Sequence, residues 1–224
     1  MKTIVLFFLR NVSEMFEMKN DRKKAGCIIL IAFLCLVTSS SYGWTENWEQ
    51  IKKEAGRIES ISADFSQEKH LKILTRPLIS KGILCFQKPD SLRWEYKTPV
   101  PSILVSHQGK TKQFIKENGV FVENSGANLM AMQFVLREIT NWLSGHFDKN
   151  PDFKAVLMSN RRIVLQPEKK EMSLIITRIE LLLSERPGLI ESVKIYESED
   201  SFTVLTFDKS ELNKKIDLIR FQSH

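Results

Sequence analysis

The sequence predicts an α+β fold, mainly β, in which helices close one side of a strongly curved antiparallel sheet of about ten strands. Most apolar residues lie in short stretches with period-two alternation, and brief turns separate these stretches. Strands joined by short turns must be antiparallel. Only two segments repeat their apolar residues at helical spacing. Because an antiparallel sheet packs one face and leaves the other needing cover, we expect these two helices to provide it.

The first helix is predicted for residues 45–59, where four apolar residues recur at helical spacing: Trp48, Ile51, Ala55 and Ile58. Strands follow at 63–67 and 78–86. The segment 92–97 is the cleanest amphipathic strand, because one face is apolar and aromatic and the other is charged. Pro99 and Pro101 end this strand.

The middle of the chain continues the meander and then changes to helix. Strands are predicted at 102–106 and 111–116, and Asn118-Gly119 is a strong hairpin signal that leads into 120–122. The second helix then has its apolar positions at Leu129, Met132, Leu136, Ile139 and Leu143, and ends at Gly145. The remaining strands are predicted at 153–158, 162–166, 174–183, 189–196 and 202–207, before a last apolar stretch at 216–221.

Residues 1–43 have the layout of a secretory signal peptide. Four basic residues between Lys19 and Lys24 precede an apolar run of 13 residues, and small residues follow, with cleavage points after Ser41 or Gly43. The run is shorter than the roughly 20 residues that cross a bilayer, although an uncleaved amphipathic anchor is an alternative. Translation that starts at Met18 would exclude residues 1–17. We therefore expect one exported domain at residues 44–224, located in the periplasm.

Charge and cysteine content exclude several classes of function. Residues 1–43 hold six of the 33 Lys and Arg and three of the 27 Asp and Glu, which leaves a net charge of +3 for residues 44–224. These charges are interspersed, whereas a nucleic-acid site would show a stripe of one sign. Cys85 alone remains beyond the signal segment, so no intramolecular disulfide is expected. We predict no nucleic-acid partner.

Known catalytic and metal-binding patterns are absent from the sequence. The four histidines are far apart, and there is no nucleophile elbow, phosphate-binding loop or dinucleotide fingerprint. We therefore predict no enzyme, no catalytic residue, no metal and no cofactor. A hydrolase that uses His107 with an unidentified partner is kept as a weaker hypothesis.

Apolar side chains on neighbouring strands form the candidate binding surface. They would either fill a packed core or line a cavity that takes in acyl chains. On the strands these residues are Phe65, Leu84, Phe86, Leu92, Trp94, Ile103, Val105 and Phe114, and on the covering helix they are Met132 and Leu136. Methionine on a lid would suit irregular partners, because its thioether side chain is flexible.

Three sequence segments between about Ser60 and Gly119 are similar to the outer-membrane lipoprotein carrier (LolA) family. The first is Ser-Ala-Asp-Phe-Ser-Gln at 62–67 followed by Ser-Lys-Gly-Ile-Leu at 80–84. The second is Lys-Pro-Asp-Ser-Leu-Arg-Trp-Glu-Tyr at 88–96. The third is Ile-Leu-Val-Ser at 103–106 with Gly-Lys at 109–110. Beyond Gly119 the resemblance rests on the order and length of the elements.

This resemblance implies an open half-barrel of antiparallel strands with a helical lid. It also implies a periplasmic shuttle, expected to be a monomer, that shields the acyl chains of lipoproteins. It implies receipt of cargo from an inner-membrane ABC transporter and delivery to an outer-membrane acceptor. The family has an arginine that holds the lid through backbone carbonyls where this chain has Lys88, so we expect Lys88 to be a weaker lid latch. Two alternatives stay open: a carrier of another lipid or glycolipid, and a non-enzymatic regulatory module that binds a protein segment.

Overall fold

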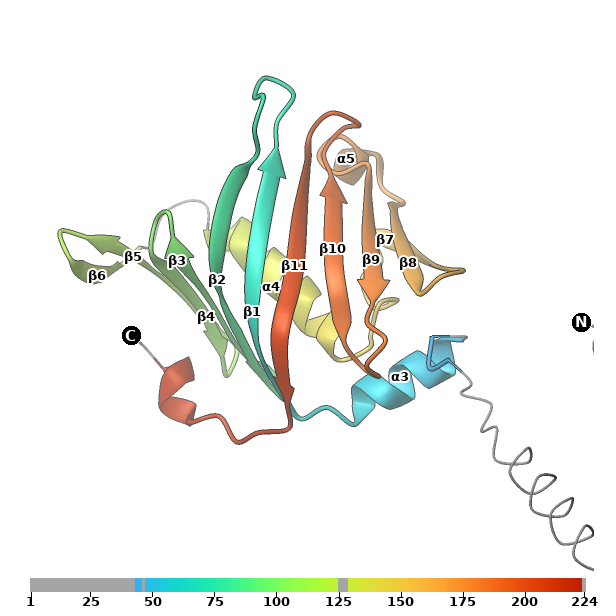
Figure 1. The fold of residues 1–224 in the computed structure, drawn as a ribbon, viewed down its shortest axis with the longest axis horizontal. Coiled ribbons are helices and arrows are strands. Elements are labelled where there is room, and N and C mark those ends of the chain that lie inside the picture. Colours follow the sequence, from blue (N-terminus) through green and yellow to red (C-terminus); the bar gives the residue numbers. More distant parts are fainter. Residues whose placement is uncertain (1–42, 46, 125–128, 223–224) are drawn as a thin grey trace, which may run out of the picture. The chain divides into compact units, whose positions relative to one another are not determined.

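Eleven antiparallel strands form one curved, unclosed sheet in the computed structural model, which describes residues 43–45, 47–124 and 129–222 (Figure 1). The side chains of residues 129–135 are not among those described. The strand order is β6-β5-β4-β3-β2-β1-β11-β10-β9-β8-β7. The predicted fold class is confirmed. The signal peptide predicted for residues 1–43 lies outside the described residues, except for Gly43.

Two meanders make up the sheet, and the first and last strands join them. The first meander contains β1 (Ser60–His70), β2 (Leu78–Gln87), β3 (Ser91–Thr98), β4 (Ser102–His107), β5 (Lys110–Glu117) and β6 (Val120–Glu123). The second contains β7 (Phe153–Met158), β8 (Arg162–Pro167), β9 (Arg178–Leu183), β10 (Ile190–Tyr196) and β11 (Phe202–Leu212). β1 pairs with β11 from Ile61 opposite Leu212 to His70 opposite Phe202. This pairing makes one continuous sheet.

Within the described residues, four helical elements accompany the sheet: α3 (Trp48–Gly56), α4 (Leu129–Leu143), α5 (Lys170–Ser173) and the 3₁₀ helix η2 (Leu218–Phe221). The Asn47 side chain caps α3 by accepting a hydrogen bond from the Gln50 N–H at 2.9 Å. Gly145, at φ +76°, follows α4, and a Cβ there would lie 2.8 Å from the Cβ of Ala55 in α3. Among the described residues, we find no helix with the length and apolar character needed to span a bilayer.

The apolar core is divided between the two faces of the sheet. The larger cluster lies on the concave face, where α4 contributes Leu136, Ile139 and Trp142, and α3 contributes Ile51. A smaller cluster lies on the convex face, where Phe221 of η2 packs with Cys85 and neighbouring residues. Helices therefore cover both faces, but only the concave face carries the long helix α4 (Figure 1).

One predicted strand was wrong over its first half. Residues 174–183 were expected to be extended, but β9 begins at Arg178 and the short helix α5 ends at Ser173. The Ile175 and Ile176 N–H groups donate to the Met172 carbonyl, which holds this segment in turns. The segment 174–176 therefore lies beyond the sheet and lines a cavity.

Candidate functional site: an apolar cavity beneath helix α4

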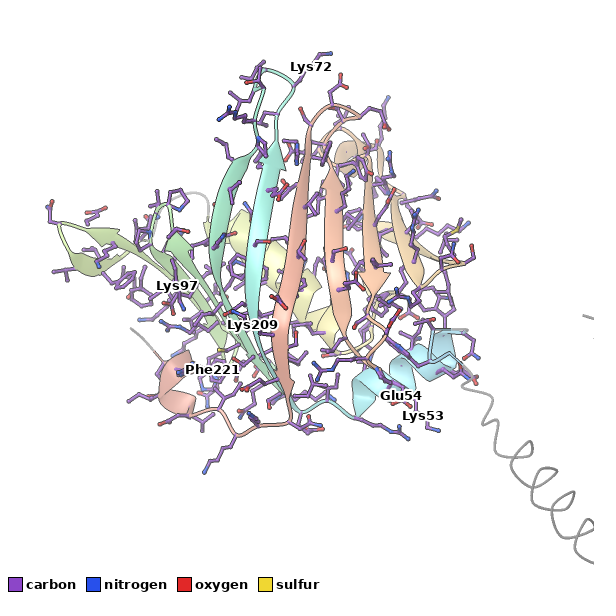
Figure 2. The ribbon with its side chains drawn as sticks, viewed as in Figure 1. Lys53, Glu54, Lys72, Lys97, Lys209 and Phe221 are labelled. Carbon is purple, nitrogen blue, oxygen red and sulfur yellow. The ribbon has the colours of Figure 1, made fainter. Side chains whose placement is uncertain are left out.

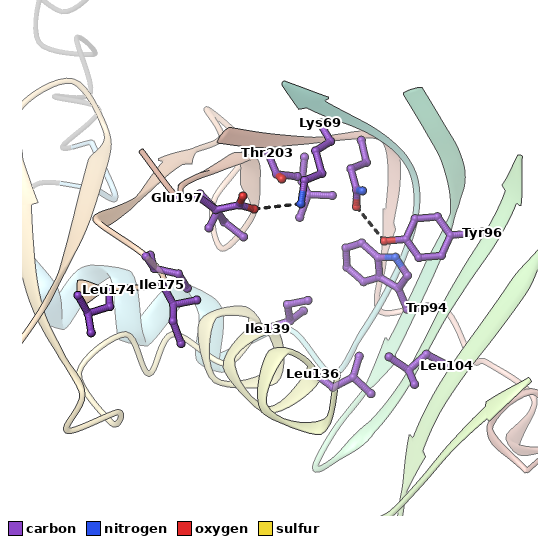
Figure 3. Close-up of a pocket in the computed structure, with 14 residues that line it drawn as sticks. Lys69, Trp94, Tyr96, Leu104, Leu136, Ile139, Leu174, Ile175, Glu197 and Thr203 are labelled. Carbon is purple, nitrogen blue, oxygen red and sulfur yellow. Dashed lines mark hydrogen bonds and ion pairs between the residues drawn. The ribbon is translucent and has the colours of Figure 1, made fainter. Parts of the chain in front are cut away.

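A cavity of about 630 Å³ lies between the concave face of the sheet and α4 (Figure 3). This volume falls in the range that is usual for small-molecule sites. Strands of both meanders, α4 and the segment after α5 contribute to its wall. The lining residues are Gln67, Lys69, Trp94, Tyr96, Leu104, Leu136, Ile139, Leu174, Ile175, Ile176, Ile195, Glu197, Thr203 and Leu205.

Packed aromatic rings form one wall of the cavity. The ring centroids of Trp94 and Phe65 lie 4.5 Å apart, and the ring of Tyr96 is perpendicular to that of Phe65 at 5.2 Å between centroids. The Phe65 ring covers Gly82, its direct partner on β2. A Cβ at Gly82 would lie 1.9 Å from the Glu95 carbonyl oxygen and 2.7 Å from the Phe65 ring. The absence of a side chain at Gly82 therefore allows this wall to close.

Few polar groups interrupt the apolar lining. Tyr96 donates its hydroxyl to the Gln67 Oε1 at 2.8 Å, and burial raises the pKa of this tyrosine. Lys69 and Glu197 form an ion pair at 3.1 Å. The Trp94 Nε1–H is buried and has no hydrogen-bond partner within the described part of the chain. Such a lining favours a ligand that is largely hydrocarbon.

The cavity opens at the end of the sheet where the β1–β2 and β10–β11 hairpins turn, which we name the hairpin end. Leu174 and Ile175 line the cavity and yet are 79% and 65% exposed, so they mark its mouth. The opposite end is filled by the side chains of α3 and by Trp142 and Leu143 of α4. The concave face is thus packed at one end and hollow at the other.

Only some of the predicted lining residues reach the cavity. Trp94 and Leu136 line it. Four others are buried in the concave core beside it: Phe65, Leu84, Phe86 and Leu92. The side chain of Met132 lies outside the described residues, although its position belongs to α4.

Three predicted lining residues are corrected, because the structure places them on the convex face. Ile103, Val105 and Phe114 are buried with Phe221 beneath η2. Side chains alternate along a strand, and it is Leu104 that lies opposite Trp94 and faces the cavity. The sequence stretch Ile-Leu-Val is apolar on both faces, so alternation alone could not assign its inward residue.

Lys88 contacts the end of helix α3. Its Nζ donates to the Gly56 carbonyl at 2.6 Å and lies 3.5 Å from the Ala55 carbonyl. Glu59 forms a longer ion pair with the same Nζ at 3.7 Å. The carbonyls of the last helical turn carry partial negative charge, so a cation at this position is favourable. The contact joins the turn after β2 to the C-terminal end of α3, and the role of Lys88 as a latch stays a prediction.

Several cavity residues were not predicted from the sequence: Leu104, Ile195, Thr203, Leu205 and the segment 174–176. Most belong to the second meander, where the sequence has no motif that indicates a binding site. Ile195 and Thr203 are opposite each other on β10 and β11, and Thr203 is opposite Lys69 of β1. Their position beside the first meander follows from the pairing of β1 with β11. These two strands are far apart in the sequence, and no local sequence signal predicts that they pair.

The histidine considered for hydrolysis is engaged on the convex side. Nδ1 of His107 lies 2.7 Å from the Ser91 hydroxyl, and Phe221 stacks on the imidazole at 6.2 Å between centroids. Ser91 is only 4% exposed, so its hydroxyl is not presented to a substrate. No cluster of three or more His, Cys, Asp or Glu that could hold a metal occurs within the described ranges.

Comparison with known proteins identifies the family. The profile described as outer membrane lipoprotein carrier protein LolA matches residues 56–224. The chain belongs to the LolA family. A curated relative of this LolA-family chain, an uncharacterized protein of Rickettsia prowazekii, is 26% identical over 208 residues, which cover 88% of this chain and 87% of the relative.

Solved structures of similar fold have low sequence identity to this LolA-family chain. A putative outer membrane lipoprotein-sorting protein domain from Vibrio parahaemolyticus has a TM-score of 0.42 and 10% identity, covering 78% of this chain and 94% of that one. A LolA superfamily protein from Nitrosomonas europaea has a TM-score of 0.38 and 8% identity, with coverages of 78% and 97%. The MucA/MucB complex from Pseudomonas aeruginosa has a TM-score of 0.46 and 13% identity, with coverages of 80% and 61%.

Proposed function

We propose that this protein is a periplasmic carrier that shields the acyl chains of lipoproteins in the cavity beneath α4. The observation that supports this most directly is an apolar space of about 630 Å³ with an aromatic wall and an exposed aliphatic mouth. Each methylene removed from water contributes about 0.8 kcal/mol, so an acyl chain gains strongly from such a lining. Apart from the Tyr96–Gln67 hydrogen bond and the Lys69–Glu197 ion pair, most of the lining side chains are apolar.

The carrier would act as a monomer between two membrane partners. In this proposal an inner-membrane ABC transporter supplies the lipoprotein, and an outer-membrane acceptor removes it. Residues 1–43 would direct export and be cleaved. Lys88 would latch α3 to β2 and keep the packed end closed while cargo enters at the hollow end.

Filling the cavity from β11 tests the proposal. Thr203 lines the cavity, so Thr203→Trp occupies space that the acyl chain needs. Thr206 lies on the same strand, but its side chain is on the opposite face of the sheet and is exposed. Thr206→Trp is therefore the matched control. Binding of a fluorescent fatty-acyl probe should weaken at least tenfold in the first variant, the cost of losing about two buried methylenes. It should be unchanged in the second.

Two outcomes would contradict the proposal. One is probe binding that is equal in the two Thr→Trp variants, which would place the acyl chain elsewhere. The other is a wild-type protein that binds no acyl probe and carries no acylated peptide in mass spectrometry of the native preparation. The regulatory module that binds a protein segment would then be favoured. If a lipid other than a lipoprotein co-purified, the protein would still be a carrier, but its cargo would be that lipid.

A further inference from the structure

The turn between β1 and β2 projects beyond the neighbouring strands at the hairpin end (Figures 1 and 2). Ile73 is 87% exposed, Leu74 is 41% exposed, and Leu78 and Ile79 are each 53% exposed. Four large aliphatic side chains thus reach solvent within seven residues. Single exposed aliphatic residues are ordinary, but a contiguous group of this kind marks an interaction surface. We name residues 71–79 the hairpin tip.

The hairpin tip itself has two cations, Lys72 and Arg76, and no Asp or Glu. From Lys69 to Lys81 the chain has four Lys and Arg and no Asp or Glu. The β10–β11 turn supplies the acidic neighbours, since Glu197 pairs with Lys69 at 3.1 Å and Asp200 pairs with Lys72 at 3.2 Å. Arg76 is exposed and has no ion pair within the described part of the chain. Aliphatic side chains interleaved with cations are complementary to an anionic lipid interface.

The hairpin tip and the cavity mouth lie at the same end of the sheet. His70, the last residue of β1, is opposite Phe202, and Phe202 is opposite Tyr196. Tyr196 is in turn opposite Arg178, the first residue of β9. The mouth residues at 174–175 come just before β9, so four neighbouring strand ends bring the tip and the mouth to one edge.

We propose that the hairpin tip docks on the surface of an anionic bilayer and inserts its aliphatic side chains there. Ile73 and Leu74 would enter the headgroup boundary while Arg76 contacts lipid phosphates, as in other amphipathic membrane anchors. The tip is a projecting finger and not a groove, which favours a deformable lipid surface over a folded partner. Docking does not depend on the proposed carrier function, but its use in cargo transfer at the cavity mouth rests on that function.

Sedimentation with lipid vesicles tests the docking. The protein is expressed from the full-length gene and its N-terminus is determined by mass spectrometry. The vesicles are either pure phosphatidylcholine or phosphatidylcholine with roughly one third phosphatidylglycerol. Ile73→Glu should weaken binding to the anionic vesicles at least tenfold. The matched control is Ile219→Glu in η2, a residue that is 65% exposed and lies away from the tip, and it should bind like wild type.

A charge variant separates lipid headgroup recognition from simple apolar adhesion. Arg76→Gln should weaken binding to the anionic vesicles about fivefold, the effect of one cation near an anionic surface, and should leave binding to neutral vesicles unchanged. Equal binding of wild type and Ile73→Glu to anionic vesicles would overturn the proposal. The proposal would also be overturned if the wild-type protein did not bind vesicles while Ile73→Glu impaired lipoprotein delivery in cells. The tip would then contact a protein.

The same variants keep this inference distinct from the carrier function. Ile73→Glu should retain wild-type affinity for the acyl probe, and Thr203→Trp should retain vesicle binding. If the wild-type protein binds vesicles but not the acyl probe, the carrier function is rejected and the membrane-docking proposal stands. If the wild-type protein binds the acyl probe but not vesicles, the membrane-docking proposal is rejected and the carrier function stands.

Discussion

Removal of the Lys88 ammonium should loosen α3 by a measurable amount. Lys88→Met keeps the aliphatic stem and deletes the 2.6 Å hydrogen bond to the Gly56 carbonyl. A hydrogen bond to a charged group contributes about 1.5–3 kcal/mol. Gly56 is exposed and water can replace the donor, so we expect the low end, about 1.5 kcal/mol. The ion pair with Glu59 adds little, because that carboxylate is 72% exposed.

Thermal unfolding measures this loss directly. For a domain of this size, 1.5 kcal/mol corresponds to a decrease of about 3–6 °C in Tm. Lys88→Arg should unfold at or above the wild-type temperature, since a guanidinium fork can donate to the Ala55 and Gly56 carbonyls together. Lys53→Met is the charge control, because Lys53 is exposed on the same helix (Figure 2) and should change Tm by less than about 1 °C. A Lys88→Met protein with the Tm of the Lys53 variant would refute the latch.

Two further substitutions test the aromatic wall and the buried acid of α4. Gly82→Ala should destabilise the fold by at least about 3 kcal/mol in urea unfolding, because its Cβ would lie 1.9 Å from the Glu95 carbonyl. Gly56→Ala has nothing within 4 Å and should be neutral or stabilising, and similar losses in both glycine variants would contradict the crowding argument. Burial raises the pKa of Glu138, so ionisation in the folded state costs stability as pH rises above the unfolded pKa. Glu138→Gln should therefore raise Tm at pH 7.5 and have no effect near pH 4, and a gain that is equal at both pH values would exclude this ionisation as its cause.

The sequence predicted elements better than it predicted which residues share a space. The strand 92–97 was assigned with its correct inward face, because one side is apolar and the other charged. Helix α4 was placed over Leu129–Leu143 with its end at Gly145, and α3 was found within 45–59. These assignments depend on local periodicity and capping, which a single sequence displays.

The convex cluster and the cavity depend on contacts between distant segments. Phe114 and Ile103 are apolar because η2 covers them, and nothing in their own strands distinguishes this cover from α4. The segment 174–177 has strand-like composition, yet its backbone turns back on Met172. The family resemblance predicted that Lys88 contacts backbone carbonyls of a lid, but it did not indicate that these carbonyls belong to α3.

The division of the concave face into a packed half and a hollow half gives the two ends different physical roles. At the packed end, Ile51 of α3 is fully buried, and Gly145 lets α3 and α4 approach closely. A change there alters the free energy of unfolding. At the hollow end, Leu174 and Ile175 are exposed beside the apolar cavity, so changes there alter what the protein can bind. Variants at Lys88 should therefore move Tm more than acyl-probe affinity, and variants at Thr203 should do the reverse. This separation follows from one sheet that is filled at one end only.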